Sequence, residues 1–95
     1  MKILIPFTLS NEAKRKTQEL IDEGWHFMLC YEPANNLIPN GEGMIWSADF
    51  TRPLRDGKWE CYVSGIDVED ASTAIIKSYE NIKNGKKLKY GNYED

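Results

Sequence analysis

A single histidine limits the acid–base and nucleophilic chemistry open to this chain of 95 residues. His26 stands in a segment that alternates apolar and polar residues, so as a strand it would share one face with Met28 and Cys30. The same alternation places six more polar residues on that face: Ser47, Asp49, Thr51, Glu60, Tyr62 and Ser64. A Ser-His-Asp or Cys-His set could be assembled from these residue types. An open sheet face excludes no water and forms no oxyanion hole, so we expect no enzymatic activity.

Metal and cofactor sites are not expected either. His26 and Cys30 would face the same side of a strand, but the alternation around Cys61 turns that residue to the opposite side. No third soft ligand then remains, whereas structural zinc takes four ligands. The same geometry opposes a disulfide between the two cysteines, and reduced thiols are typical of cytoplasmic proteins. The run at 40–43, Asn-Gly-Glu-Gly, lacks the Lys-Ser/Thr pair of loops that cradle phosphate.

Two amphipathic helices would support such a face from behind. Ser10 or Asn11 can cap the first helix, which ends at Gly24, and Asp67 can cap a second helix that ends at Gly85. Each has an apolar stripe at helical spacing: Ala13, Thr17, Leu20 and Ile21 in the first, and Ala71, Ala74, Ile75, Ser78 and Ile82 in the second.

Strands are predicted between and before these helices. Alternation predicts three strands over 25–32, 44–52 and 58–66, and an apolar run predicts a short strand over 3–7. All three tryptophans and two phenylalanines fall on the apolar side of the three alternating strands: Trp25, Trp46, Trp59, Phe27 and Phe50. The fold class is therefore α+β, in the order β-α-β-β-β-α, with an antiparallel meander and both helices on its apolar face.

The chain is expected to form one compact domain over 1–85, followed by a tail over 86–95 that is basic and then acidic. The apolar run at the N-terminus is too short for a signal peptide. No stretch approaches the roughly 18 apolar residues of a membrane-spanning helix. We expect a cytoplasmic protein without membrane contact.

The segment from Pro33 to Gly43 is longer than a hairpin connection needs. Such loops are enriched in function. Leu37 and Ile38 lie in its middle, and two interpretations are open. They can tuck against the core, which is favoured because exposed aliphatic pairs are uncommon on monomers, or they can be anchors for a partner.

Charge is distributed unevenly along the chain, which carries a net charge of −3. From 17 to 76 there are eleven acidic and three basic residues, a net charge of −8; from 77 to 89 there are five lysines and one acid, a net charge of +4. Four lysines of the basic segment could contact phosphate: Lys83, Lys86, Lys87 and Lys89. The favoured interpretation is a helix end that complements the helix dipole, followed by a solvated tail.

The α-β-β-β-α portion resembles double-stranded-RNA-binding domains in element order. Those domains are basic at the start of their last helix, where they grip phosphates. Here the sequence at 67–70 is Asp-Val-Glu-Asp, which would repel phosphate. A β-β-β-α unit with an acidic helix entry is also similar to small antitoxin domains built on a degraded ribonuclease-H core. Both resemblances concern element order alone.

The sequence favours a small non-enzymatic protein-interaction module of the regulator or inhibitor type, such as an accessory protein of a phage or mobile element. The candidate partner-binding residues lie in the long loop and on the polar sheet face: Leu37, Ile38, His26, Met28, Asp49 and Tyr62. The alternative is a nucleic-acid-binding regulator that uses the basic C-terminal segment. A homodimer formed by edge pairing or through the open face is also compatible with so short a meander.

Overall fold

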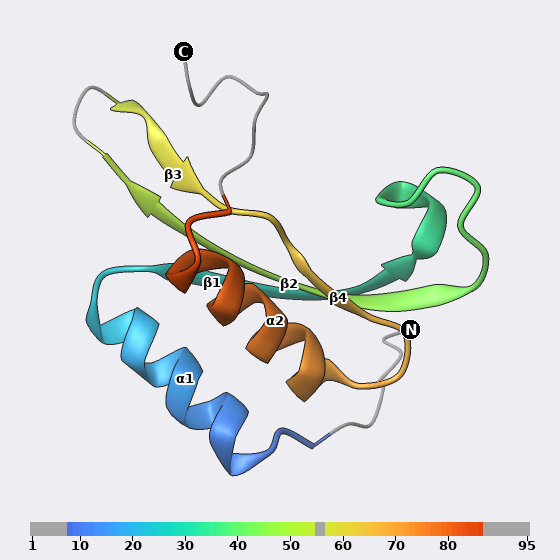
Figure 1. Cartoon of the computed structure of the whole chain (residues 1–95), viewed down its shortest axis with the longest axis horizontal. Helices are drawn as coiled ribbons and strands as arrows, with labels where there is room; N and C mark the ends of the chain where they lie inside the picture. Colours follow the sequence, from blue (N-terminus) through green and yellow to red (C-terminus); the bar gives the residue numbers. More distant parts are fainter. Residues whose placement is uncertain (1–7, 55–56, 87–95) are drawn as a thin grey trace, which may run out of the picture.

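The structure is a computed structural model that describes residues 8–54 and 57–86. Its elements are α1 (Asn11–Asp22), β1 (His26–Pro33), the short 3-10 helix η1 (Ala34–Asn36), β2 (Met44–Pro53), β3 (Trp59–Cys61), β4 (Gly65–Asp67) and α2 (Ala71–Lys83). The strands form one antiparallel sheet, and both α-helices lie on the same side of it (Figure 1). The predicted α+β class with both helices on one sheet face is confirmed. The predicted strand over 3–7 and residues 87–95 of the predicted tail lie outside the described residues.

The central strand of the sheet is β2. All eight residues of β1 pair with it in one unbroken register. On its other side β2 pairs with β3, where Thr51 lies opposite Cys61, and with β4, where Ala48 lies opposite Gly65. Cys61 and Gly65 are four residues apart, but their partners Thr51 and Ala48 are only three apart on β2. The segment between β3 and β4 therefore contains one extra residue, which forms a β-bulge.

The single strand predicted over 58–66 is wrong, because the bulge divides it into β3 and β4. Its predicted alternation is also wrong. A two-residue Asp-Gly turn would place Leu54 opposite Trp59, but the ladder pairs Pro53 with Trp59. This shift by one residue turns Trp59 to the sheet face away from the helices, here called the open face. Trp59 is consequently 40% exposed instead of buried in the core. Cys61, opposite Thr51, shares the open face with Cys30.

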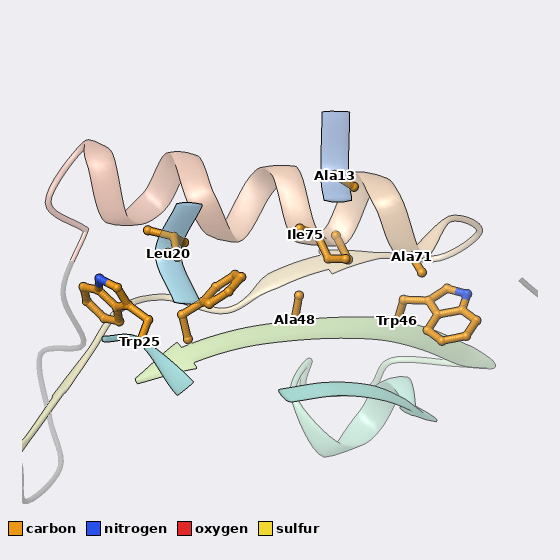
Figure 2. Close-up of a cluster of buried hydrophobic side chains, with 9 residues drawn as sticks. Ala13, Leu20, Trp25, Trp46, Ala48, Ala71 and Ile75 are labelled. Carbon is orange, nitrogen blue, oxygen red and sulfur yellow. The ribbon is translucent and has the colours of Figure 1, made fainter. Parts of the chain in front are cut away.

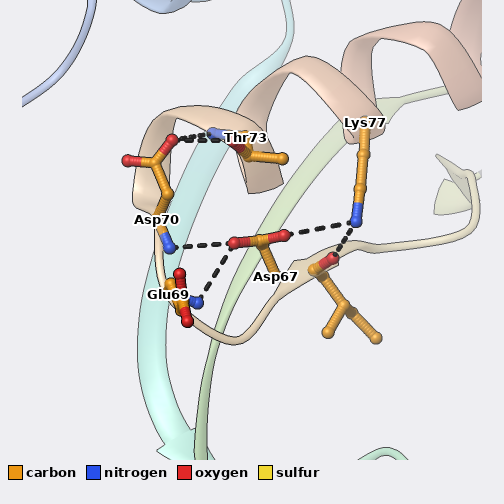
Figure 3. Close-up of polar contacts among 6 residues, drawn as sticks. Asp67, Glu69, Asp70, Thr73 and Lys77 are labelled. Carbon is orange, nitrogen blue, oxygen red and sulfur yellow. Dashed lines mark hydrogen bonds and ion pairs between the residues drawn. The ribbon is translucent and has the colours of Figure 1, made fainter.

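Side-chain caps determine where both helices begin. The Ser10 hydroxyl accepts a hydrogen bond from the Ala13 N–H at 3.1 Å, as expected for the predicted cap. The cap predicted for the second helix is wrong, because Asp70 and not Asp67 holds that position. The Asp70 carboxylate accepts hydrogen bonds from the Thr73 N–H at 3.0 Å and the Thr73 hydroxyl at 2.6 Å (Figure 3).

Asp67 stabilises the turn that leads from β4 into α2. Its carboxylate accepts hydrogen bonds from the N–H groups of Glu69 and Asp70, and Lys77 lies 3.4 Å away as an ion-pair partner (Figure 3). Desolvation opposes ionisation, but these backbone donors and Lys77 outweigh it and lower the pKa of Asp67. The acidic sequence at 67–70 thus stabilises the turn before α2 through hydrogen bonds within the chain.

The hydrophobic core lies between the sheet and the two helices (Figure 2). Its buried members are Ala13 and Leu20 of α1, Ala71, Ala74 and Ile75 of α2, and Trp25, Trp46, Ala48 and Phe50 of the sheet side. Ile21, predicted as part of the α1 stripe, is exposed because it lies about 100° around the helix from Leu20. The core joins both helices to one face of the sheet and leaves the open face turned away from them.

Candidate interaction surface

The open face carries three of the residues that the sequence analysis selected as partner-binding. Met28 lies opposite Asp49 and His26 lies opposite Thr51 in the β1–β2 ladder, and directly opposite residues share a sheet face. Both α-helices pack on the other face (Figure 1). His26, Met28 and Asp49 therefore lie together on a face that neither α1 nor α2 covers.

One end of the open face is apolar and exposed. Met28 is 60% exposed, the most open of the large hydrophobic residues on this face. The ring of Trp59 meets the ring of His26 edge-on, with 5.5 Å between the ring centroids. Trp59 is absent from the sequence-predicted surface because the alternation over 58–66 predicts it in the core; the register of the β2–β3 hairpin is the signal that places it here. Tryptophan and methionine are residue types enriched in protein interfaces.

The middle of the open face is polar and partly buried. The Ser64 hydroxyl donates a hydrogen bond to Asp49, and the Ser47 hydroxyl donates one to Glu32 at 2.5 Å. Burial raises the pKa of Asp49 against the opposing Ser64 hydrogen bond, and the charge of Glu32 adds to the rise. Burial and the charges of Glu32 and Asp49 also raise the pKa of Cys30. A thiol held in its protonated form is a poor nucleophile.

The loop between β1 and β2 lies on the open side of the sheet (Figure 1). Leu37 is 44% exposed and Ile38 is 41% exposed, so the favoured interpretation that they tuck against the core is wrong. The buried position in this loop belongs to Ala34, which is 3% exposed. A Cβ at Gly41 would lie 3.0 Å from the Ala34 Cβ, and the Ile38 N–H bonds to the Ala34 carbonyl at 2.9 Å. This tight winding around Ala34 leaves the two larger side chains at the surface.

Tyr62 does not belong to this surface, which corrects its predicted place on the open face. Its ring lies 5.8 Å from the ring of Trp25 on the helix side of the sheet. Its hydroxyl donates to Glu60 at 2.6 Å, and Arg52 bonds to the same carboxylate at 2.9 Å. Burial, together with the hydrogen bond to Glu60, raises the pKa of Tyr62 to about 12. Glu60 was likewise predicted on the open face and lies on the helix side.

The basic segment is only partly described. Lys83 lies 3.2 Å from Glu19 of α1, above the ring of Tyr79 at 5.1 Å from its centroid. The hydrogen bond to Glu19 raises the pKa of Lys83. Lys86 is exposed at the end of the described chain, while Lys87 and Lys89 lie outside the described residues. Lys83 therefore makes an intramolecular ion pair that a phosphate contact would have to compete with.

Within residues 8–54 and 57–86, no group of three or more His, Cys, Asp or Glu side chains could hold a metal ion. In the same residues no helix is long and apolar enough to span a membrane. A scan against protein-family models, a search of curated proteins and a search of solved structures each found no match. Six residues form the candidate surface, here called the interaction surface: Leu37, Ile38, His26, Met28, Asp49 and Trp59.

Proposed function

We propose that this protein is a small non-enzymatic protein-interaction module, of the regulator or inhibitor type, that binds its partner through the interaction surface. The observation that supports the proposal most directly is the exposure of four large apolar side chains on the open side of the sheet. Leu37, Ile38, Met28 and Trp59 are each between 40% and 60% exposed. Burying such side chains against a partner contributes roughly 25 cal/mol per Å² of apolar area.

The chemistry of the surface defines the kind of partner that fits. Met28 and Trp59 lie at one end and Leu37 and Ile38 at the other; the carboxylate of Asp49 lies beside Met28, and that of Glu32 lies nearer the loop. A complementary partner presents apolar side chains with basic groups between them, because interfaces match apolar cores and opposite charges. This composition supports a protein partner over nucleic acid, whose phosphates the two carboxylates would repel.

The test is capture of binding partners by a tagged chain carrying Leu37→Asp and Ile38→Asp together. We expect the double variant to lose a partner that the wild type retains, with affinity reduced by roughly tenfold or more. Both side chains are already exposed, so the fold should tolerate the change. Leu54→Asp is the matched control, since Leu54 is 45% exposed in the β2–β3 connection and away from the loop.

Two results would contradict the proposal. Equal capture by the wild type and the double variant would remove Leu37 and Ile38 from the binding surface. Capture that disappears after nuclease treatment and weakens steeply with salt would instead favour the nucleic-acid alternative. In that case Lys83→Ala and Lys86→Ala should reduce capture, whereas the loop variant should not.

A further inference from the structure

In the part of the chain that the structure describes, β1 is an edge strand of the sheet. Among the described residues β1 pairs only with β2, so every second residue directs its N–H and C=O groups away from the sheet. The strand is eight residues long and contains no lysine, no bulge and no proline before its last residue. It carries apolar side chains on both faces, with Phe27, Leu29 and Tyr31 on the helix side and Met28 on the open side. A long apolar edge strand without lysine, a bulge or an internal proline is a template for pairing with another strand.

The opposite edge of the sheet, formed by β3 and β4, is protected against pairing with another strand. β3 and β4 have three residues each and are separated by the bulge. The Val63 N–H bonds to the Lys86 carbonyl at 2.9 Å, and the Asn81 amide bonds to the Val63 carbonyl at 2.9 Å. Lys77 donates to the Ile66 carbonyl at 3.0 Å. Several backbone groups on this side are therefore used within the chain, which leaves β1 as the edge available for pairing within residues 8–54 and 57–86.

We propose that β1 pairs with β1 of a second copy of this chain, antiparallel and centred on Leu29. A two-fold axis through Leu29 places each residue opposite the residue of the second copy that lies equally far from position 29 on its other side. His26 then lies opposite Glu32 of the second copy, Phe27 opposite Tyr31, and Met28 opposite Cys30. The interface is isologous, and the axis stands perpendicular to the sheet, so the helices of both copies lie on the same side.

The side chains of β1 complement themselves in this register. At each end of the pairing the polar ring of His26 lies opposite the polar side chain of Glu32, so that polar residues face one another across the strands. The aromatic pair Phe27 and Tyr31 forms twice on the helix side, where both side chains are only partly covered by their own chain. A second copy therefore matches the edge, with polar side chains opposite polar ones and aromatic side chains opposite aromatic ones.

The mass of the purified protein in solution tests the pairing. Sedimentation velocity should give twice the 11.0 kDa of the chain for the wild type. Met28→Lys places a charge beside the axis and should raise the dissociation constant by roughly tenfold or more. Met44→Lys is the matched control: Met44 is also exposed but lies on β2, away from the edge, and should leave the mass unchanged.

A cross-link tests the register independently of any loss of folding. Directly opposite residues of antiparallel strands have Cα atoms about 4.5–5.5 Å apart, within the range that a disulfide spans. Met28→Cys in a Cys61→Ser background should therefore form a covalent dimer with a mild oxidant, through Cys30 of the second copy. The Cys61→Ser background alone should not, because Cys30 then has no thiol opposite it.

A monomeric wild type at every accessible concentration would overturn the proposal. A dimer that survives Met28→Lys and gives no cross-link would overturn it as well, since its interface would lie elsewhere. The readout is mass and not capture, so failure of the pairing is distinct from failure of the proposed function. Leu37→Asp with Ile38→Asp should remove the partner and leave the dimer intact.

Discussion

Asp49 lies half-buried in the middle of the open face, where its carboxylate accepts a hydrogen bond from Ser64. Burial raises its pKa above the ordinary value of 3.8. Between 3.8 and the raised pKa of Asp49, the folded chain holds a proton that the unfolded chain has released, so the free energy of unfolding falls as pH rises through this window. We expect Asp49→Asn to remove this fall and to be more stable than the wild type at neutral pH. Urea unfolding at a series of pH values measures both effects.

Ser64→Ala should strengthen the pH dependence of stability that Asp49→Asn removes. The Ser64 hydrogen bond lowers the pKa of Asp49, so its removal should raise that pKa further. The loss of stability with rising pH should then extend over a wider window. If neither variant changed the pH dependence, the environment of Asp49 would have no influence on its ionisation.

At the scale of the elements, local signals explain which parts of the fold were predictable. The Ser10 cap, the glycine stops and the alternation of β1 and β2 are written in adjacent residues, and all appear in the structure. The register of β3 is not local, because a shift by one residue in a hairpin turns each side chain to the other face. Trp59 and Tyr62 exchanged faces for this reason.

The candidate site was likewise predictable where local alternation determines it and not where it depends on contacts between distant residues. His26, Met28 and Asp49 lie on strands whose alternation is regular, so their shared face followed from the sequence. The exposure of Leu37 and Ile38 depends on how the loop winds around Ala34, which involves contacts between residues seven apart and no periodic pattern. Trp59 could be added to the surface only after the ladder between β2 and β3 was known.

The close approach of α2 to β4 gives a prediction about a single element contact. A Cβ at Gly65 would lie 2.0 Å from the Ala74 carbonyl oxygen and 2.4 Å from the Ser78 nitrogen, both backbone atoms of α2. Gly65→Ala must therefore push the helix away from the sheet, and we expect it to lower the free energy of unfolding by roughly 3 kcal/mol. Chemical denaturation measures this loss.

Gly43→Ala is the control for the Gly65 variant. A Cβ at Gly43 would meet nothing within 4 Å, so its replacement adds only the strain of a φ of 77°. That strain costs roughly 1 kcal/mol. Gly65 itself has no positive φ, so similar losses in the two variants would contradict the prediction that the close approach of α2 to β4 determines the requirement for glycine at position 65.

At the scale of the whole molecule, the one-sided arrangement of the layers accounts for both proposed interactions. Two helices cover one face of the sheet, which leaves the open face for a partner and the β1 edge for a second copy. The two surfaces meet along β1, because Met28 and His26 belong to the open face and to the edge strand at once. Pairing through β1 would join the open faces of two copies into one continuous surface, so that a partner could meet two interaction surfaces side by side.

Dimerisation through β1 would also couple folding to protein concentration. A dimer that unfolds to two monomers gains stability with concentration by mass action, about 1.4 kcal/mol per dimer for each tenfold increase. For a chain of 95 residues this raises the Tm by roughly 3–4 °C. We expect this dependence in calorimetry of the wild type and of Met44→Lys, and a lower Tm at each concentration for Met28→Lys, because its dimer is weaker. A wild-type Tm that does not change with concentration would mean that the edge of β1 stays unpaired in the folded protein.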